Sequence, residues 1–334
     1  MADIFQFFYA LQTYAFMQRA MLAAIIIGVV CSLVGVFILL RGMVFLGEAI
    51  AHSAFAGAAL ALLIKINPLM SILVFSVGSA VGIGYVNEKK VMRNEIIIGI
   101  VFSFFMALAI LFIGLMEQYS TEIQSILFGN ILLVTQENFV LLLAFGAIVL
   151  ALLIFTKKEL FLMTFDTDYA EITGIPVRFL NYLFLILISI TISVSLKAIG
   201  AVLVFALIVT PAAAAYQWTF QLNRLLVLAA AFGVFGSVFG LIFSYLLDVP
   251  SGSTIVTVVT TVFILSFIFS PKRRQAKLTP VDCIYCKEYI LEEGSCADPD
   301  DCPAAKIPHH HTETGYVIKK HDLPKKGPTK HDHS

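Results

Sequence analysis

Long apolar runs, separated by short polar segments, fill the first 270 residues of the chain. A helix needs about 20 apolar residues to cross the hydrocarbon core of a bilayer. Each such run therefore predicts one membrane-spanning helix, and the chain holds nine, at residues 20–40, 45–64, 69–86, 95–116, 131–155, 178–196, 199–217, 225–247 and 253–270.

Two positions leave the number of crossings open between eight and ten. Residues 41–52 contain two glycines and several ionisable residues, which favours a broken or re-entrant segment at the start of the second span. Residues 4–17 mix apolar residues with Gln and Tyr, and they are interpreted as a short amphipathic segment at the membrane surface rather than a cleavable signal peptide.

Composition confirms a membrane protein and separates its two parts. The chain is 59% hydrophobic and 13% charged, whereas soluble domains are about 45–50% apolar and about 25% charged. Residues 271–334 nevertheless hold 11 of the 22 Lys and Arg, six of the seven His and four of the five Cys. We therefore expect an all-α polytopic membrane domain over residues 1–270 and a hydrophilic, mostly disordered tail over residues 271–334.

The placement of basic residues predicts the orientation in the cell membrane. With the tail in the cytoplasm, three basic residues face outward (Arg19, Lys65 and Lys197). Twelve then face inward: Arg41, Lys89, Lys90, Arg93, Lys157, Lys158, Arg178, Arg224, Lys272, Arg273, Arg274 and Lys277. This bias toward the cytoplasm, with an odd number of spans, predicts an N-terminus outside the cell and a cytoplasmic C-terminus.

Glu48 and His52 are ionisable residues inside the second predicted span. Four residues are just over one helical turn, so both side chains project from the same face. An ionisable residue within a membrane is a candidate functional residue, and a carboxylate beside an imidazole offers two ligands for a divalent transition metal. The alternative is a buried ion pair that only fixes helix packing.

Residues 157–179 form the longest polar interruption before the tail. Asp168 and Glu171 resemble a capping box, and Gly174 followed by Pro176 indicates a helix end, so we expect a short helix over about 168–173. This segment is interpreted either as a plain connection between spans or as a docking helix for a cytoplasmic motor subunit.

The chain carries no sequence pattern of an enzyme. It lacks the G-x-x-x-x-G-K-[ST] phosphate loop, the G-x-S-x-G and H-E-x-x-H motifs and a dinucleotide fingerprint. We therefore expect a transport subunit without catalytic residues or a permanently bound cofactor, and without a nucleic-acid partner. If ATP drives it, another chain binds the nucleotide.

Three segments resemble the membrane permeases of manganese, zinc and iron ABC importers, the ABC-3 family: RGMVFLGEAIAHSAFAGAAL at 41–60, FDTDYAEITGIP at 165–176 and IGAVLVFALIVTPAAAA at 199–215. LFGNIL at 127–132 also agrees. The resemblance implies a fold similar to the type II importer permeases for cobalamin and siderophores. It also implies a second permease copy, an ATPase partner and an extracytoplasmic metal-binding protein.

The resemblance assigns roles to particular residues. ATPase docking falls on 165–176, with Asp166, Asp168, Glu171 and Gly174 as candidates, and the metal pathway falls on Glu48 and His52. Two copies about an axis along the pathway would supply four ligands. The family more often has Asp at the first ligand position, and the extra methylene of Glu48 moves its carboxylate by roughly 1 Å.

The tail contains a second group of candidate metal ligands. They are Cys283, Cys286, Cys296 and Cys302, followed by His309, His310 and His311. In a reducing cytoplasm four cysteines favour a zinc site, outside the cell they favour two disulfides, and a passive tail is the remaining alternative.

Together these features predict a permease subunit that imports a divalent transition metal. The tail thiolates and imidazoles favour zinc, with manganese or iron as the other candidates. Two alternatives stay open at this stage: a proton-coupled secondary metal transporter, and a membrane metal sensor that signals through the tail.

Overall fold

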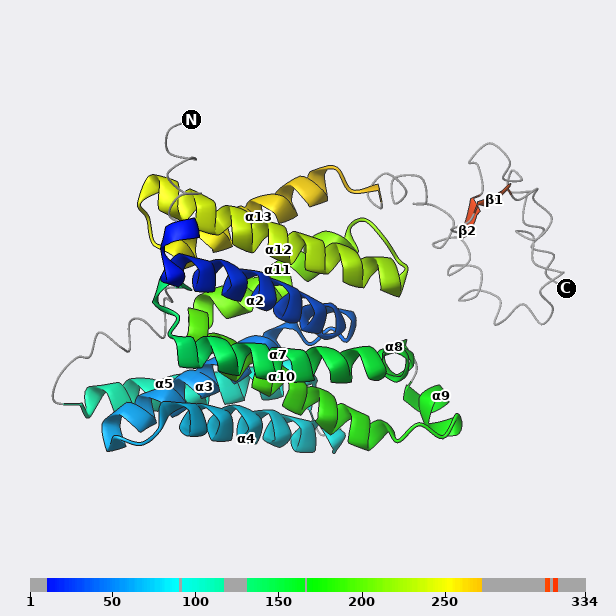
Figure 1. Cartoon of the computed structure of the whole chain (residues 1–334). Coiled ribbons are helices and arrows are strands. Elements are labelled where there is room, and N and C mark those ends of the chain that lie inside the picture. Colours follow the sequence, from blue (N-terminus) through cyan, green and yellow to red (C-terminus); the bar gives the residue numbers. More distant parts are fainter. Residues whose placement is uncertain are drawn as a thin grey trace, which may run out of the picture. The chain divides into compact units, whose positions relative to one another are not determined.

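The computed structural model describes residues 11–89, 92–116, 131–165, 167–271, 310–312 and 315–317. Contacts between Cα atoms divide the chain into two units, Met1–Phe269 and Ser270–Ser334. The first unit is a bundle of helices (Figure 1).

The bundle follows the apolar runs of the sequence closely. Eight of the described helices are long and apolar enough to cross a membrane, and α11 is shorter, at 16 residues. The elements are α2 (Ala15–Leu40), α3 (Val44–Ile64), α4 (Pro68–Glu88), α5 (Asn94–Gly114), the 3-10 turn η1 (Ile131–Leu133), α7 (Gln136–Phe155), α8 (Lys157–Phe165), α9 (Thr167–Ile172), α10 (Val177–Ile199), α11 (Ala201–Tyr216), α12 (Leu222–Leu247) and α13 (Ser251–Ile268). The prediction of an all-α protein with eight to ten spans is confirmed.

The start of the second span differs from the prediction. Helix α3 runs without a break from Val44, so Glu48 and His52 lie in regular helix rather than in a re-entrant segment. The interruption is confined to the tight turn after α2, where Gly42 has a φ of 67°. One glycine is enough for this turn, because a left-handed conformation costs glycine little. Of the predicted amphipathic segment, residues 4–10 lie outside the described part of the chain.

Glycines in the spans allow the helices to approach closely. A Cβ atom on Gly28 would stand 2.8 Å from the carbonyl oxygen of Gly233, and one on Gly57 would stand 2.7 Å from that of Ser71. A Cβ atom on Gly35, Gly236 or Gly240 would likewise stand less than 3.0 Å from an atom of a neighbouring helix. Gly200 has a different role, since its φ of 87° ends α10 and begins α11.

Helix packing places α3 beside the elements that matter for function. It packs against α4 and α5, and it also contacts α10. Helix α2 packs against α11 and α12, while α10 packs against α4 and α7. The short helices α8 and α9 lie at one end of the bundle, next to the start of α10 (Figure 1).

Only two short strands are described in the second unit. They are β1 (His310–Thr312) and β2 (Gly315–Val317), paired antiparallel with His310 opposite Val317. His309 and the four tail cysteines, Cys283, Cys286, Cys296 and Cys302, lie outside the described residues, as does most of the tail that was predicted to be disordered.

Candidate functional site

Helix α3 brings Glu48 and His52 together as their spacing predicts. The Nε2 atom of His52 lies 3.9 Å from Oε1 of Glu48. Two ligands that each lie about 2.1 Å from one metal ion are separated by no more than roughly 4.2 Å. The two atoms can therefore contact the same divalent ion with little side-chain movement.

The surroundings of the pair are apolar and partly open. The side chain of His52 is 17% exposed and that of Glu48 is 33% exposed. The imidazole packs edge-on against Phe102 of α5, with ring centroids 4.8 Å apart. Its Nδ1 atom is buried and has no hydrogen-bond partner among the described residues. The ring thus packs against Phe102, and its Nε2 atom faces Glu48.

A single copy of the chain supplies only part of a metal site. Among the described residues no group of three or more His, Cys, Asp or Glu side chains could hold an ion. Glu48 and His52 contribute one oxygen and one nitrogen ligand, whereas first-row divalent metals in proteins are usually held by four or more ligands. Further ligands must come from water molecules bound to the metal ion or from another chain.

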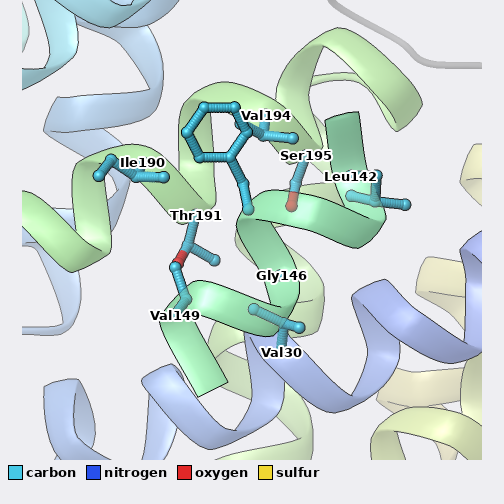
Figure 2. A pocket seen from close by; sticks show the side chains of 9 residues that line it. Val30, Leu142, Gly146, Val149, Ile190, Thr191, Val194 and Ser195 are labelled. Atoms are coloured by element: carbon cyan, nitrogen blue, oxygen red, sulfur yellow. The ribbon is translucent and has the colours of Figure 1, made fainter. Parts of the chain in front are cut away.

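Two cavities lined by described residues lie away from Glu48 and His52. One, of about 10 Å³, lies between α2, α7 and α10 (Figure 2) and is lined mainly by apolar side chains such as Val30, Leu142 and Val149. A space of this size scarcely holds one water molecule. A larger cavity of about 460 Å³ lies between the end of α2, α8 and the α11–α12 turn, and it is lined by Leu39, Phe161 and Tyr216 among others, without a carboxylate or imidazole.

Buried serine hydroxyls connect α3, the helix that carries Glu48 and His52, to the neighbouring helices. Ser53, directly after His52, pairs with Ser79 of α4 at 2.7 Å between the Oγ atoms. Ser76 of α4 pairs in turn with Ser193 of α10, and Ser189 donates to the carbonyl oxygen of Ser76 at 3.3 Å. These bonds tie α3 to α4 and α4 to α10.

The segment predicted to dock a motor subunit is an exposed helix. Helix α9 spans Thr167–Ile172, close to the predicted 168–173, and Gly174 ends it with a φ of 82°. Asp168, Glu171 and Gly174 are all exposed, while Asp166 lies outside the described residues.

Exposed apolar side chains in this segment were not predicted from the sequence. Ile172 is 84% exposed, and Phe165 and Tyr169 are also exposed large side chains. Tyr169 and Ile172 lie three residues apart on α9, a spacing that places them on one side of that helix, and Phe165 ends the preceding helix α8. That spacing was the available signal. An exposed apolar patch rimmed by acidic residues is typical of a protein-binding surface.

Comparison with known proteins places these features in a family. Residues 13–270 match the family model of the ABC 3 transport family. The chain is 39% identical to the manganese transport system membrane protein MntC of Halalkalibacterium halodurans, over 82% of this chain and 94% of the relative. It is 37% identical to MntC of Listeria monocytogenes, over 80% and 95% respectively.

A solved structure agrees with the fold. PsaBC from Streptococcus pneumoniae, determined in complex with Fab, superposes with a TM-score of 0.74 at 36% identity, covering 82% of this chain and 99% of that one. The matched part of this chain contains α3 with Glu48 and His52, and also α8 and α9.

Proposed function

Because the chain belongs to the ABC 3 transport family, we propose that it is the subunit through which manganese passes Glu48 and His52 into the cell. It is a multi-pass permease of the plasma membrane, similar to ABC transporter subunits named for manganese transport. The observation that carries the proposal is the Glu48–His52 pair, at 3.9 Å, inside a membrane-spanning helix.

Manganese suits the pair better than the zinc that the sequence analysis favoured, and the relatives do not support zinc. The preference for zinc came from the tail, whose thiolates and imidazoles lie beyond residue 270, where the family match ends. They say nothing about the ions that α3 contacts. Glu48 supplies a carboxylate oxygen, a ligand type that manganese prefers. Iron and a tail-bound zinc ion likewise find no support in the comparisons.

Three partners complete the proposed transporter. A second copy of the chain would bring another Glu48 and His52 to the pathway, so that four side chains surround the ion. An ATPase subunit would dock on α9, where Ile172 and Tyr169 are exposed beside Asp168 and Glu171. An extracytoplasmic binding protein would deliver the metal to the outer face.

The orientation that we propose keeps the docking helix inside the cell. Helix ends alternate along the chain, so the ends that carry Arg41, Lys89, Lys157, Arg178 and Arg224 lie on one side of the membrane. The excess of basic residues favours the cytoplasm for that side. The N-terminus is then outside, and α9 and the tail face the cytoplasm.

Uptake by the reconstituted transporter tests the proposal. We expect vesicles that contain the permease, its ATPase and its binding protein to accumulate manganese only with ATP. Glu48→Ala and His52→Ala should each lower uptake at least about tenfold, as for loss of a group that supports a metal site. Glu137→Ala, which removes an exposed acid at the start of α7, is the matched control and should keep the native rate.

Two outcomes would contradict the proposal. If both α3 variants import manganese at the native rate, the pair is not on the pathway. If a pH gradient drives uptake without any ATPase, the chain is a proton-coupled transporter, the first alternative. The second alternative, a sensor, requires that deletion of residues 271–334 abolishes activity, whereas a permease keeps its transport.

A further inference from the structure

Arg41 lies in the turn between α2 and α3, seven residues before Glu48. Its Nη1 atom donates a hydrogen bond to Oδ1 of Asn181 at 3.1 Å, and its guanidinium lies 4.5 Å from the ring centroid of Phe184. Both partners belong to α10. The contact therefore joins the turn that leads into the metal helix to a different span.

The charge on Arg41 has a cost that calls for an explanation. Burial lowers the pKa of Arg41 to about 10, so the group stays protonated at neutral pH. Asn181 and Phe184 are neutral, and no carboxylate lies within 4 Å of this guanidinium among the described residues. A partly buried charge without an opposite partner is costly, and the Nη2 atom of Arg41 is fully buried. Simple packing of α2 against α10 would be served as well by an apolar residue.

The contact of Arg41 with α10 lies close in sequence to the docking segment. Helix α10 begins at Val177, three residues after Gly174 closes the docking segment. Asn181 and Phe184 are the fifth and eighth residues of α10. The start of this helix lies at the end of the bundle where α8 and α9 are found (Figure 1). Arg41 therefore joins the turn that leads into α3 to the start of α10, the helix that follows the docking segment.

Two buried polar atoms at this end of the bundle lack partners among the described residues. Within the described residues, Nη2 of Arg41 and Oε2 of Glu159 are both buried without a hydrogen bond. Glu159 belongs to α8, which packs against both α2 and α10. Leu40 and Phe161, neighbours of Arg41 and Glu159, line the same cavity at this end of the bundle. The donor and the acceptor have opposite charges, and pairing them would satisfy both.

We propose that Arg41 is a positioning residue for transport, which couples the docking segment to the metal pair by exchanging partners. In the state described here Arg41 holds Asn181 and Phe184. When the ATPase moves α8 and α9, Nη2 pairs with Oε2 of Glu159, and the turn into α3 shifts with it. This inference rests on the proposed function, because it assigns Arg41 a role in the coupling of that same transporter.

Coupling is measured as manganese imported per ATP hydrolysed in the reconstituted complex. We expect Arg41→Gln and Glu159→Gln each to lower this ratio about tenfold, within the range of coupling energies for residues in one network. Equilibrium manganese binding and the basal ATPase rate should stay near their native values. The double variant should be no worse than either single variant, because the two residues act as one unit.

Matched controls separate coupling from folding. Lys158→Gln, which removes an exposed charge next to Glu159, and Arg178→Gln, which removes an exposed cation at the start of α10, should leave the ratio unchanged. Arg41→Lys keeps the charge but loses the planar fork of donors, so it should restore only part of the ratio.

The inference is wrong if the ratio of Arg41→Gln equals the native ratio. It is also wrong if uptake and ATP hydrolysis fall in parallel with thermal stability, since that result marks a merely structural contact. Additive losses in the double variant would refute the exchange with Glu159. Native uptake by Glu48→Ala would instead overturn the proposed function, so the two failures are distinguishable.

Discussion

Close packing of α2 against α11 depends on the missing side chain of Gly35. A Cβ atom at this position would stand 2.7 Å from the carbonyl carbon of Ile208, whereas ordinary contact begins at 3.4 Å. The obstruction is backbone on both sides, so no side chain can rotate away. Gly35→Ala must therefore push the two helices apart.

The expected cost of Gly35→Ala is about 2–3 kcal/mol, at the upper end of the usual range for overpacking. Alanine gains up to about 1 kcal/mol over glycine in helix propensity, which offsets part of this cost. The matched control is Gly78→Ala on α4, where an added Cβ would meet nothing within 4 Å. Only the propensity gain applies there, so this variant should be as stable as the native chain or slightly more stable.

Thermal unfolding of the purified proteins, followed by circular dichroism of the helical signal, measures the difference. We expect Gly35→Ala to melt about 4–10 °C below Gly78→Ala, from the usual relation between free energy and melting temperature. If the two variants melt at the same temperature, the close approach of α2 and α11 is not as described here. The packing of α2 at this point would then need another explanation.

Three further predictions concern the site and its neighbours. Ile172→Asp should abolish co-purification of the ATPase without lowering thermal stability, because the side chain is 84% exposed on α9. The control Thr219→Asp, in the α11–α12 turn, should still co-purify with the ATPase. Retention of the ATPase by Ile172→Asp would refute docking on α9. Ser76→Ala should destabilise the protein by about 0.5–1.5 kcal/mol. Adding Ser193→Ala should cause a smaller further loss, because the two hydroxyls share one hydrogen bond. Full additivity in a double-mutant cycle would contradict that bond. Glu48→Asp should retain manganese uptake at an altered apparent affinity, because the carboxylate stays but moves by roughly 1 Å; complete loss of uptake would show that its reach is essential.

The spans could be predicted from sequence because the membrane imposes both their length and their apolar character. The same physics made Glu48 and His52 conspicuous, since few other ionisable residues lie inside the runs. Helix α9 was predicted from its own capping and stop residues, Asp168 and Gly174. In each case the signal is local to the segment.

The remaining features depend on partners that are distant in sequence. Ser76 and Ser193 each look like an ordinary small residue in an apolar span, and only the packing of α4 on α10 makes them a pair. Arg41 was predicted only as a cytoplasmic charge, because nothing nearby in the sequence indicates Asn181 as its acceptor. The preference for zinc rested on residues beyond 270, which lie outside the family match, and the relatives named for manganese transport do not support it.

Stoichiometric binding of manganese to the purified permease tests the central claim most directly. We expect one weakly held ion for every two chains, with a nitrogen ligand detectable by electron paramagnetic resonance of the bound ion. That nitrogen signal should vanish in His52→Ala, and binding should be lost in Glu48→Ala. An unchanged nitrogen signal and full occupancy in both variants would show that manganese binds elsewhere.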